Sequence, residues 1–229
     1  IGKKLARYLA SQYQLEFNAI YNGWSNEDVI TKTWSVLKAH NTQNQYLYYA
    51  GTIYPHRKEA LSSVLRALRG FDELRLRIRV LRDSTEHGIE NIIESHGLVN
   101  RVDLLPPVSN TIVSEEMAAS QGLLVLENLT TSRLHDCTVT GKLFGLLASG
   151  VPGIAVSSPT GEIRAIVQEI GGWHGVSTEA ECVHAIQNLG KSKVTSENKE
   201  KIADIFNGEK WNRLRKDFLE GKRPDACTR

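Results

Sequence analysis

The stretch VTGKLFGLLASGVP, residues 139–152, decides how the rest of this sequence is read. It begins as a short loop and passes through a Gly-Lys step into an apolar helix of about three turns. Gly150 ends the helix, and Pro152 blocks its continuation before the apolar run Gly153–Val156. A helix that opens on Thr-Gly-Lys, at 140–142, presents free backbone N–H groups and a cation at the positive end of its dipole. The stretch therefore predicts a helix start that binds a phosphate group, although a capped surface helix with a solvated lysine would have the same pattern.

Strand-like and helix-like patterns alternate on both sides of this stretch. Short apolar runs predict strands at Tyr46–Ala50, Leu74–Leu81, Arg101–Leu105, Gly122–Leu126, Gly153–Val156 and Val176. Helical spacing predicts helices at Lys58–Leu68, Ile89–His96, Thr111–Ser120, Glu162–Ile170 and Glu179–Leu189, besides the helix within 139–152. This alternation with short loops predicts an α/β fold, a Rossmann-like, doubly wound parallel sheet with helices on both faces.

The same patterns divide the chain into three parts. Residues 1–45 are expected to form a linker and inter-domain segment that starts with helical spacing, and residues 46–193 the Rossmann-like domain. Residues 194–229 are expected to form amphipathic C-terminal helices and a tail. Because ligands of doubly wound sheets bind at the carboxyl ends of the strands, the loops after the first four strands, which end at Ala50, Leu81, Leu105 and Leu126, are expected to line one cleft.

Residues 74–80, Leu-Arg-Leu-Arg-Ile-Arg-Val, alternate strictly between apolar and basic. Such alternation normally means that one face of a strand is solvated, and a solvated face is the favoured interpretation. A strand near the sheet edge, or arginines that lie over a helix or meet a partner, would give the same pattern. Glu162 follows Gly161 at the start of a predicted helix, where its carboxylate is expected to cap that helix.

Composition excludes several classes of function. A net charge of +2 gives no bulk electrostatic case for binding nucleic acid or membranes. Three widely spaced cysteines, Cys137, Cys182 and Cys227, argue against a disulfide framework and for a reducing, cytoplasmic setting. No apolar run approaches the roughly 18–20 residues that span a bilayer, and no signal peptide is expected. The chain begins at Ile1 and not at Met, so it is expected to be a piece of a longer protein.

Four segments, in this order and spacing, together resemble a known family. They are AIYNGW at 19–24, YAGTIY at 49–54 with Arg57 and Lys58, GLVNRVDLLPPV at 97–108, and TGKLFGLLASGVP at 140–152. Over about residues 17–190 the chain resembles the C-terminal, nucleotide-sugar-binding domain of GT-B glycosyltransferases of the retaining, family 4 type. The resemblance implies one half of a GT-B architecture, with the acceptor-binding domain missing from this chain.

The resemblance also implies a set of site residues. Arg57 and Lys142 would be catalytic, because they would stabilise the leaving nucleoside diphosphate. The residues expected to bind the UDP-sugar are Gly51, Thr52, Arg57, Lys58, Arg82, Pro106, Pro107, Val108, Asp136, Thr140, Gly141, Lys142 and Leu143. Within this set, Pro106 to Val108 would form an apolar shelf for the base, and Asp136 would accept hydrogen bonds from sugar hydroxyls.

The chain departs from the family pattern at its carboxylates. Gly145 stands where a ribose-binding glutamate is usual, and Cys137 stands where the other carboxylate of the pair is usual, with Asp136 beside it. A degenerate domain that serves as an interaction module is therefore an alternative, as is a transferase that uses a GDP- or ADP-sugar. An NAD-dependent Rossmann enzyme ranks low, because no Gly-x-Gly-x-x-Gly follows the first strand.

The resulting expectation is a donor-binding domain for a UDP-glucose-like sugar nucleotide in retaining sugar transfer, within polysaccharide or glycolipid biosynthesis. No metal and no other cofactor is expected, because no Asp-x-Asp motif occurs and the lysine, arginine and helix start can stabilise the diphosphate. This chain alone is expected to bind the donor without transferring sugar at a useful rate. Its partners would be the sugar nucleotide and the missing domain, which could associate with the inner face of the membrane, and not nucleic acid.

Overall fold

A six-stranded parallel sheet forms the centre of the fold. The computed structural model describes residues 2–17, 21, 45–80, 88–192, 194–205 and 216. The strands are β1 (Tyr46–Ala50), β2 (Arg75–Arg79), β3 (Val102–Leu105), β4 (Gly122–Leu126), β5 (Gly153–Val156) and β6 (Trp173–Val176). Their spatial order is β3-β2-β1-β4-β5-β6, and all neighbouring pairs are parallel. The chain therefore winds outward in one direction from β1 and in the other from β4, which makes these two strands the switch point.

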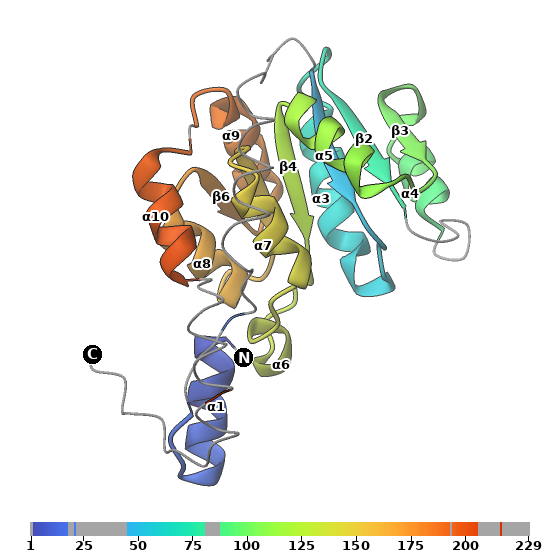
Figure 1. The fold of residues 1–229 in the computed structure, drawn as a ribbon. Helices are drawn as coiled ribbons and strands as arrows, with labels where there is room; N and C mark the ends of the chain where they lie inside the picture. The colour runs from blue at the N-terminus through green and yellow to red at the C-terminus, as the bar shows by residue number, and fades with distance from the viewer. Residues whose placement is uncertain are drawn as a thin grey trace.

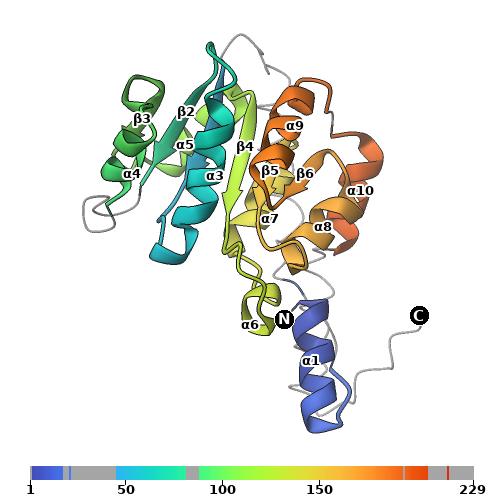
Figure 2. The same cartoon turned by 180° about the vertical axis from the view of Figure 1, so that it is seen from behind.

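Helices cover both faces of this sheet. Their bounds are α3 (Lys58–Leu68), α4 (Ile89–Ser95), α5 (Asn110–Ala119), α7 (Gly141–Ala148), α8 (Glu162–Ile170), α9 (Glu179–Leu189) and α10 (Ser196–Ile205). Figure 1 shows α5 and α7 in front of the sheet, and Figure 2, from behind, shows α3 and α9 in front of it. The prediction of a doubly wound α/β fold is confirmed.

Two apolar clusters, one on each face, hold these layers together. The strands alternate between them, so that Leu47 and Tyr49 belong to the cluster with α3, α4 and α9. Tyr46 and Tyr48 belong to the cluster with α5, α7, α8 and α10. All five residues of β4 are buried, as expected for a central strand covered on both faces.

Three short helical segments lie in stretches that were expected to be loops or strand starts. They are η2 (Pro55–Arg57), η4 (Val99–Arg101) and α6 (Arg133–Asp136). The Ser132 hydroxyl accepts a hydrogen bond from the backbone N–H of His135, so α6 has a side-chain N-cap. Such single turns carry no apolar periodicity, which is why the hydrophobic pattern does not predict them.

The alternating arginines of β2 are the main correction to the sequence interpretation. A solvated face was favoured, but Arg77 and Arg79 lie against Glu116 of α5, with side-chain exposures of 29% and 15%. The Arg79 guanidinium donates to Glu116 at 2.9 and 2.6 Å, and Arg77 lies over the ring of Tyr46. Among the three arginines of β2, only Arg75, which pairs with Asp103 of β3, has a side chain that is close to half exposed. The arginines thus lie over a helix, one of the alternatives the pattern left open.

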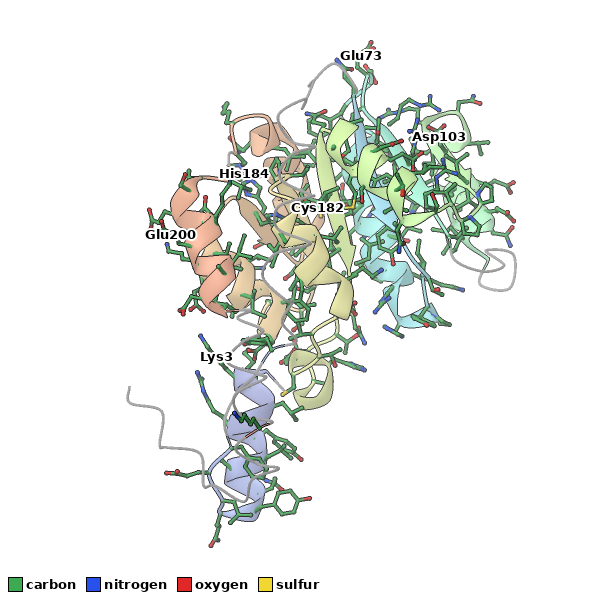
Figure 3. All side chains as sticks on the ribbon, in the orientation of Figure 1. Lys3, Glu73, Asp103, Cys182, His184 and Glu200 are labelled. Carbon is green, nitrogen blue, oxygen red and sulfur yellow. The ribbon has the colours of Figure 1, made fainter. Side chains whose placement is uncertain are left out.

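Helix α1 (Lys3–Tyr13) extends away from the sheet in both views, on the side where α6 lies (Figures 1 and 2). Its first turn is attached to α8, since the buried Glu162 carboxylate accepts hydrogen bonds from the backbone N–H groups of Lys3 and Lys4 at 2.9 and 2.7 Å. The Tyr21 hydroxyl also donates to Glu162. Figure 3 shows Lys3 at the sheet end of α1. Glu162 therefore caps α1, whereas the sequence predicted a cap for its own helix, α8.

Several predicted features lie outside the described residues. They include the loop that contains Arg82, most of the linker within 1–45, and most of the C-terminal part beyond Ile205. Within 194–205 the expected amphipathic helix is present as α10, which packs through Ile202. Among the described residues, no helix has the length and apolar character needed to cross a membrane.

Candidate functional site

The candidate site lies at the carboxyl ends of β1 and β4, the two strands at the switch point of the sheet. Gly51 follows β1, Glu127 follows β4, and the N-terminus of α7 lies beyond the loop after β4. Crevices at this point are where doubly wound sheets bind ligands. Three elements that are distant in sequence therefore converge where the sequence predicted a cleft.

Lys142 is the cation at the centre of this cluster. It stands at the second position of α7, and its Nζ lies 2.9 Å from Tyr49 Oη and 3.3 Å from the carbonyl oxygen of Ala50. The same ammonium lies 4.3 Å from the centre of the Tyr49 ring, a cation–π arrangement. Burial, aided by the charge of Arg57 and partly opposed by Glu127, lowers the pKa of Lys142 to about 8. The side chain is thus fixed at the strand end and not solvated.

Gly51 makes room for this lysine. Its φ of +133° is a conformation that residues with side chains rarely adopt, and a Cβ on it would lie 2.6 Å from Lys142 Nζ. The Gly51 N–H donates to the carbonyl oxygen of Arg79 at 2.8 Å, which continues the pairing of β1 with β2 past the strand end. The close approach of lysine to backbone therefore requires glycine here.

Arg57 and Glu127 form a buried ion pair beside Lys142. The guanidinium donates through Nη2 to Oε1 at 2.8 Å and through Nε to Oε2 at 3.2 Å, which is a bidentate arrangement. Their side chains are 10% and 9% exposed. Burial raises the pKa of the Glu127 carboxyl, while the charges of Arg57 and Lys142 oppose that rise. Sequence reasoning missed Glu127, although a glutamate directly after a fully apolar strand, Gly122–Leu126, is a signal that could have found it.

The carbonyl oxygen of Thr52 links the two cations. It accepts hydrogen bonds from Tyr49 Oη at 3.0 Å and from Arg57 Nη1 at 3.2 Å. Since Lys142 donates to the same Tyr49 oxygen, a chain of contacts runs from α7 through β1 to η2 and Glu127. Burial, as the largest effect, raises the pKa of Tyr49 to about 12, so its hydroxyl stays protonated and can donate to Thr52. The network fixes the loop after β1.

The other predicted site residues that the structure describes lie at the starts of α7 and α3 and directly after β3. Thr140 and Gly141 form the start of α7, and the side chain of Leu143 is in the core. Lys58 is the first residue of α3. Pro106, Pro107 and Val108 directly follow β3, two strands away from β1, which corresponds to about 10 Å at normal strand spacing. Arg82 lies outside the described residues.

Asp136 lies apart from these groups, at the end of α6. Its carboxylate accepts a hydrogen bond from the Thr160 hydroxyl at 2.7 Å. Asp136 and Cys137 line a cavity of about 430 Å³ whose other wall is α1, through Lys4, Tyr8, Ser11 and Gln12. Polar side chains of α1 thus face the carboxylate that is predicted to bind a sugar.

A second cavity, of about 500 Å³, lies between β6, α8 and α9.

Comparisons with known proteins give matches of structure only. Neither a scan against family models nor a search of curated proteins finds a match for this sequence. Among solved structures, AviGT4, a glycosyltransferase involved in avilamycin A biosynthesis, superposes with a TM-score of 0.67 at 13% identity over 96% of this chain and 62% of that chain. Sucrose-phosphate synthase from Thermosynechococcus elongatus gives 0.70 at 13% identity, over 96% of this chain and 58% of that one.

A third similar structure was determined with a sugar nucleotide. Anabaena HepE in complex with UDP-glucose matches with a TM-score of 0.63 at 15% identity, over 89% of this chain and 57% of HepE. The chain therefore spans 57–62% of the length of these three structures. At such identities the likeness concerns the fold, and this chain has the Rossmann-like fold of one half of a GT-B glycosyltransferase.

Proposed function

We propose that this chain is the donor-binding half of a retaining glycosyltransferase and that it binds a UDP-sugar similar to UDP-glucose. The observation that carries the proposal is the position of Lys142, fixed by Tyr49 and Ala50 at the switch point and at the start of α7. A cation and a helix N-terminus that converge at one point suit a diphosphate. Two similar structures, HepE in complex with UDP-glucose and a pneumococcal O-GlcNAc transferase in complex with UDP and GlcNAc, support uridine as the base.

The chemistry follows from where the positive charge lies. In sugar transfer the bond between the anomeric carbon and the diphosphate oxygen breaks, and negative charge grows on the departing UDP. Lys142 and the backbone N–H groups of residues 140–142 would stabilise that charge, whereas the N–H of Leu143 already donates to the Thr140 carbonyl at 3.1 Å. Arg57 would add a second positive charge close by, through a side chain whose donors are already largely engaged by Glu127 and Thr52. With these groups the site needs no divalent metal, so we propose a metal-independent reaction without a cofactor.

The remaining parts of the donor have candidate positions along the strand ends. The segment Pro106–Val108 lies about 10 Å from β1, a separation that a nucleoside diphosphate can span, and we assign it to the uracil. Asp136 is the candidate for sugar hydroxyls. Gly145 offers no carboxylate for the ribose, so ribose contacts would come from backbone groups or from another loop.

The complete reaction needs more than this chain. We propose that an acceptor-binding domain precedes it in a longer protein and that the chain alone binds UDP without transferring sugar at a useful rate. A cytoplasmic location, with membrane association through the missing domain and a role in polysaccharide or glycolipid biosynthesis, is part of the same proposal.

Isothermal titration calorimetry with UDP, GDP and ADP, each with Mg²⁺ and with EDTA, tests the proposal. We expect UDP to bind with similar affinity in both conditions and Lys142→Met to weaken binding about tenfold or more, since it removes a charge-assisted contact. Lys191→Met is the matched control, because this exposed lysine follows α9, whose last residue, Leu189, packs beside Gly122 at the start of β4, the end of that strand remote from the candidate site. A preference for GDP or ADP would mean that the donor is a GDP- or ADP-sugar. If none of the three nucleotides binds, the result would favour the interaction module that the glycine at position 145 suggests.

A further inference from the structure

Two cations and one carboxylate share a buried position at the switch point. Arg57 contacts the loop after β1 through the Thr52 carbonyl, and Lys142 contacts the end of β1 through the Ala50 carbonyl and the Tyr49 hydroxyl. Two like charges that lie near each other and away from water disfavour each other. Glu127 faces Arg57 with both oxygens and lies close enough to Lys142 to affect its charge. The arrangement is a balanced charge cluster and not a pair of free cations.

We propose that Glu127 is a positioning residue of this site, which holds the Arg57 guanidinium in place and balances the positive charges of Arg57 and Lys142. The phosphate-binding part of this inference rests on the proposed function. The effect on Lys142 does not, because it concerns only charges of the protein itself.

Glu127 fixes the orientation of Arg57 through a bidentate contact. With Nε and Nη2 directed at the carboxylate, Nη1 is the group left for the Thr52 carbonyl, and the three contacts determine the plane of the guanidinium. The ion pair joins the residue after β4 to the turn before α3, and so connects the strands on either side of the switch point. Without the carboxylate, Arg57 would be a buried charge whose described partners are the Thr52 carbonyl and the ring of Tyr54, neither of which is charged.

Glu127 also determines when Lys142 is charged. The ammonium contacts the Tyr49 hydroxyl and the Ala50 carbonyl of β1, and the charges of Arg57 in η2 and Glu127 after β4 act on it. Of these, Arg57 lowers the pKa of Lys142, together with burial, and Glu127 raises it. Tyr49 stays neutral below a pKa of about 12 and so adds no charge at neutral pH. A neutral residue at position 127 would therefore leave Lys142 partly uncharged under conditions in which phosphate binding needs its charge.

The variant Glu127→Gln keeps the shape of the side chain and removes its charge. The direct measurement is an NMR titration of the Lys142 side chain in the intact chain. We expect its midpoint to fall from about 8 by about one pH unit, a common size for the effect of one nearby charge. Glu181→Gln is the matched control, because Glu181 likewise pairs with an arginine, Arg164 at 2.9 Å, but does so beside β6. It should leave the Lys142 midpoint unchanged.

UDP binding gives a second readout. Relative to the native chain, Glu127→Gln should lose several-fold more UDP affinity near pH 8 than at pH 6, where Lys142 is protonated in both. A purely structural defect would weaken binding equally at every pH. A Lys142 midpoint that stays in place or rises in Glu127→Gln would overturn the inference. If the native chain binds no UDP while the midpoint shifts as expected, the proposed function fails and the positioning role stands.

A double variant covers the case in which Glu127→Gln does not fold. Glu127→Gln with Arg57→Met removes both charges of the buried pair, a replacement that proteins often tolerate better than an unpaired charge. Because the charge of Arg57 lowers the pKa of Lys142, its removal should place the Lys142 midpoint of the double variant at or above the native one. A midpoint well below the native value in the double variant would contradict the charge balance proposed here.

Discussion

Lys142 Nζ lies 2.9 Å from the hydroxyl oxygen of Tyr49, 93 residues earlier in the chain. The contact joins the first turn of α7 to the end of the buried strand β1, so the ammonium is held before any ligand arrives. Such preorganisation lowers the cost of binding, because the side chain need not be immobilised by the ligand. It also withdraws the ammonium from water, and this gives the site a pH dependence.

The first prediction is that UDP affinity decreases above about pH 8. Burial lowers the pKa of Lys142 to about 8 in the free chain, so above that pH the amine is increasingly neutral. A bound diphosphate favours the charged form and raises the pKa again, so binding near pH 8 should take up protons from solution. Calorimetry in buffers with different ionisation enthalpies measures this uptake. Lys142→Met should show none, and a native affinity that is flat from pH 7 to 10 would contradict the assignment.

The second prediction concerns Gly51. Gly51→Ala places a Cβ 2.6 Å from the present position of Lys142 Nζ and forces alanine to a φ of +133°, so the lysine must move. We expect UDP affinity to fall about tenfold, which corresponds to roughly one charge-assisted hydrogen bond.

Gly97→Ala is the control for backbone strain. Gly97 also has a positive φ, +69°, but nothing lies within 4 Å of the Cβ it would gain. This variant should lose about 1 kcal/mol of stability and bind UDP normally. Equal losses of affinity in the two variants would mean that strain, and not displacement of Lys142, explains the first.

The sequence predicted elements best where the pattern was local. Helix Lys58–Leu68 and strand Gly122–Leu126 have the predicted bounds, because apolar spacing within each segment carries the information. Glu127 shows the opposite case, since its partner Arg57 is 70 residues away and no local pattern announces the contact. The start of α7 could be recognised from its own residues, whereas the charge balance around it depends on tertiary contacts.

Arg77 and Arg79 illustrate a second limit. Strict alternation shows that one face of β2 is polar, but it does not show whether water or another polar side chain covers that face. Here Glu116 of α5 covers it, within 2.6 Å of Arg79 and 3.5 Å of Arg77. A covered face and a solvated one have the same period, so the sequence alone could not distinguish them.

The third prediction is that Glu116→Gln destabilises the fold more near neutral pH than in acid. The hydrogen bond from Arg79 is the main cause that lowers the pKa of Glu116 below its ordinary value of 4.5. A carboxyl with a lowered pKa contributes stability above its unfolded-state pKa and loses that contribution as the pH falls through the folded-state value. We expect a loss of about 1–3 kcal/mol at pH 7, the range for hydrogen bonds to charged groups.

Urea unfolding of the native chain and Glu116→Gln at pH 7 and pH 3 measures this difference. The difference in stability between the two proteins should be smaller at pH 3 than at pH 7, because the lower pH protonates more of the native carboxyl. Glu197→Gln is the control, because Glu197 pairs with Lys201 on the surface of α10 and should change stability little at either pH. A loss for Glu116→Gln of the same size at both pH values would show that shape, and not charge, accounts for its role.

The fourth prediction is that Glu162 holds α1 in place. The first four N–H groups of a helix have no partner within it, and the Glu162 carboxylate accepts from those of Lys3 and Lys4. Glu162→Ala removes both acceptor oxygens. We expect this change to lower the local stability by about 2 kcal/mol, which corresponds to roughly thirtyfold faster hydrogen exchange at the amides of Lys3 and Lys4.

Glu169→Ala is the matched control, because it removes a carboxylate from the same helix, α8, that also contacts Lys3. That contact joins Glu169 to Lys3 Nζ at 3.1 Å, with both side chains about half exposed, so it contributes little. Hydrogen exchange should therefore speed up in Glu162→Ala and stay nearly unchanged in Glu169→Ala. Because α1 also forms one wall of the cavity beside Asp136, loss of its anchor would open that cavity. Unchanged exchange in Glu162→Ala would mean that α1 is held by its other contacts and that the buried carboxylate serves α8 alone.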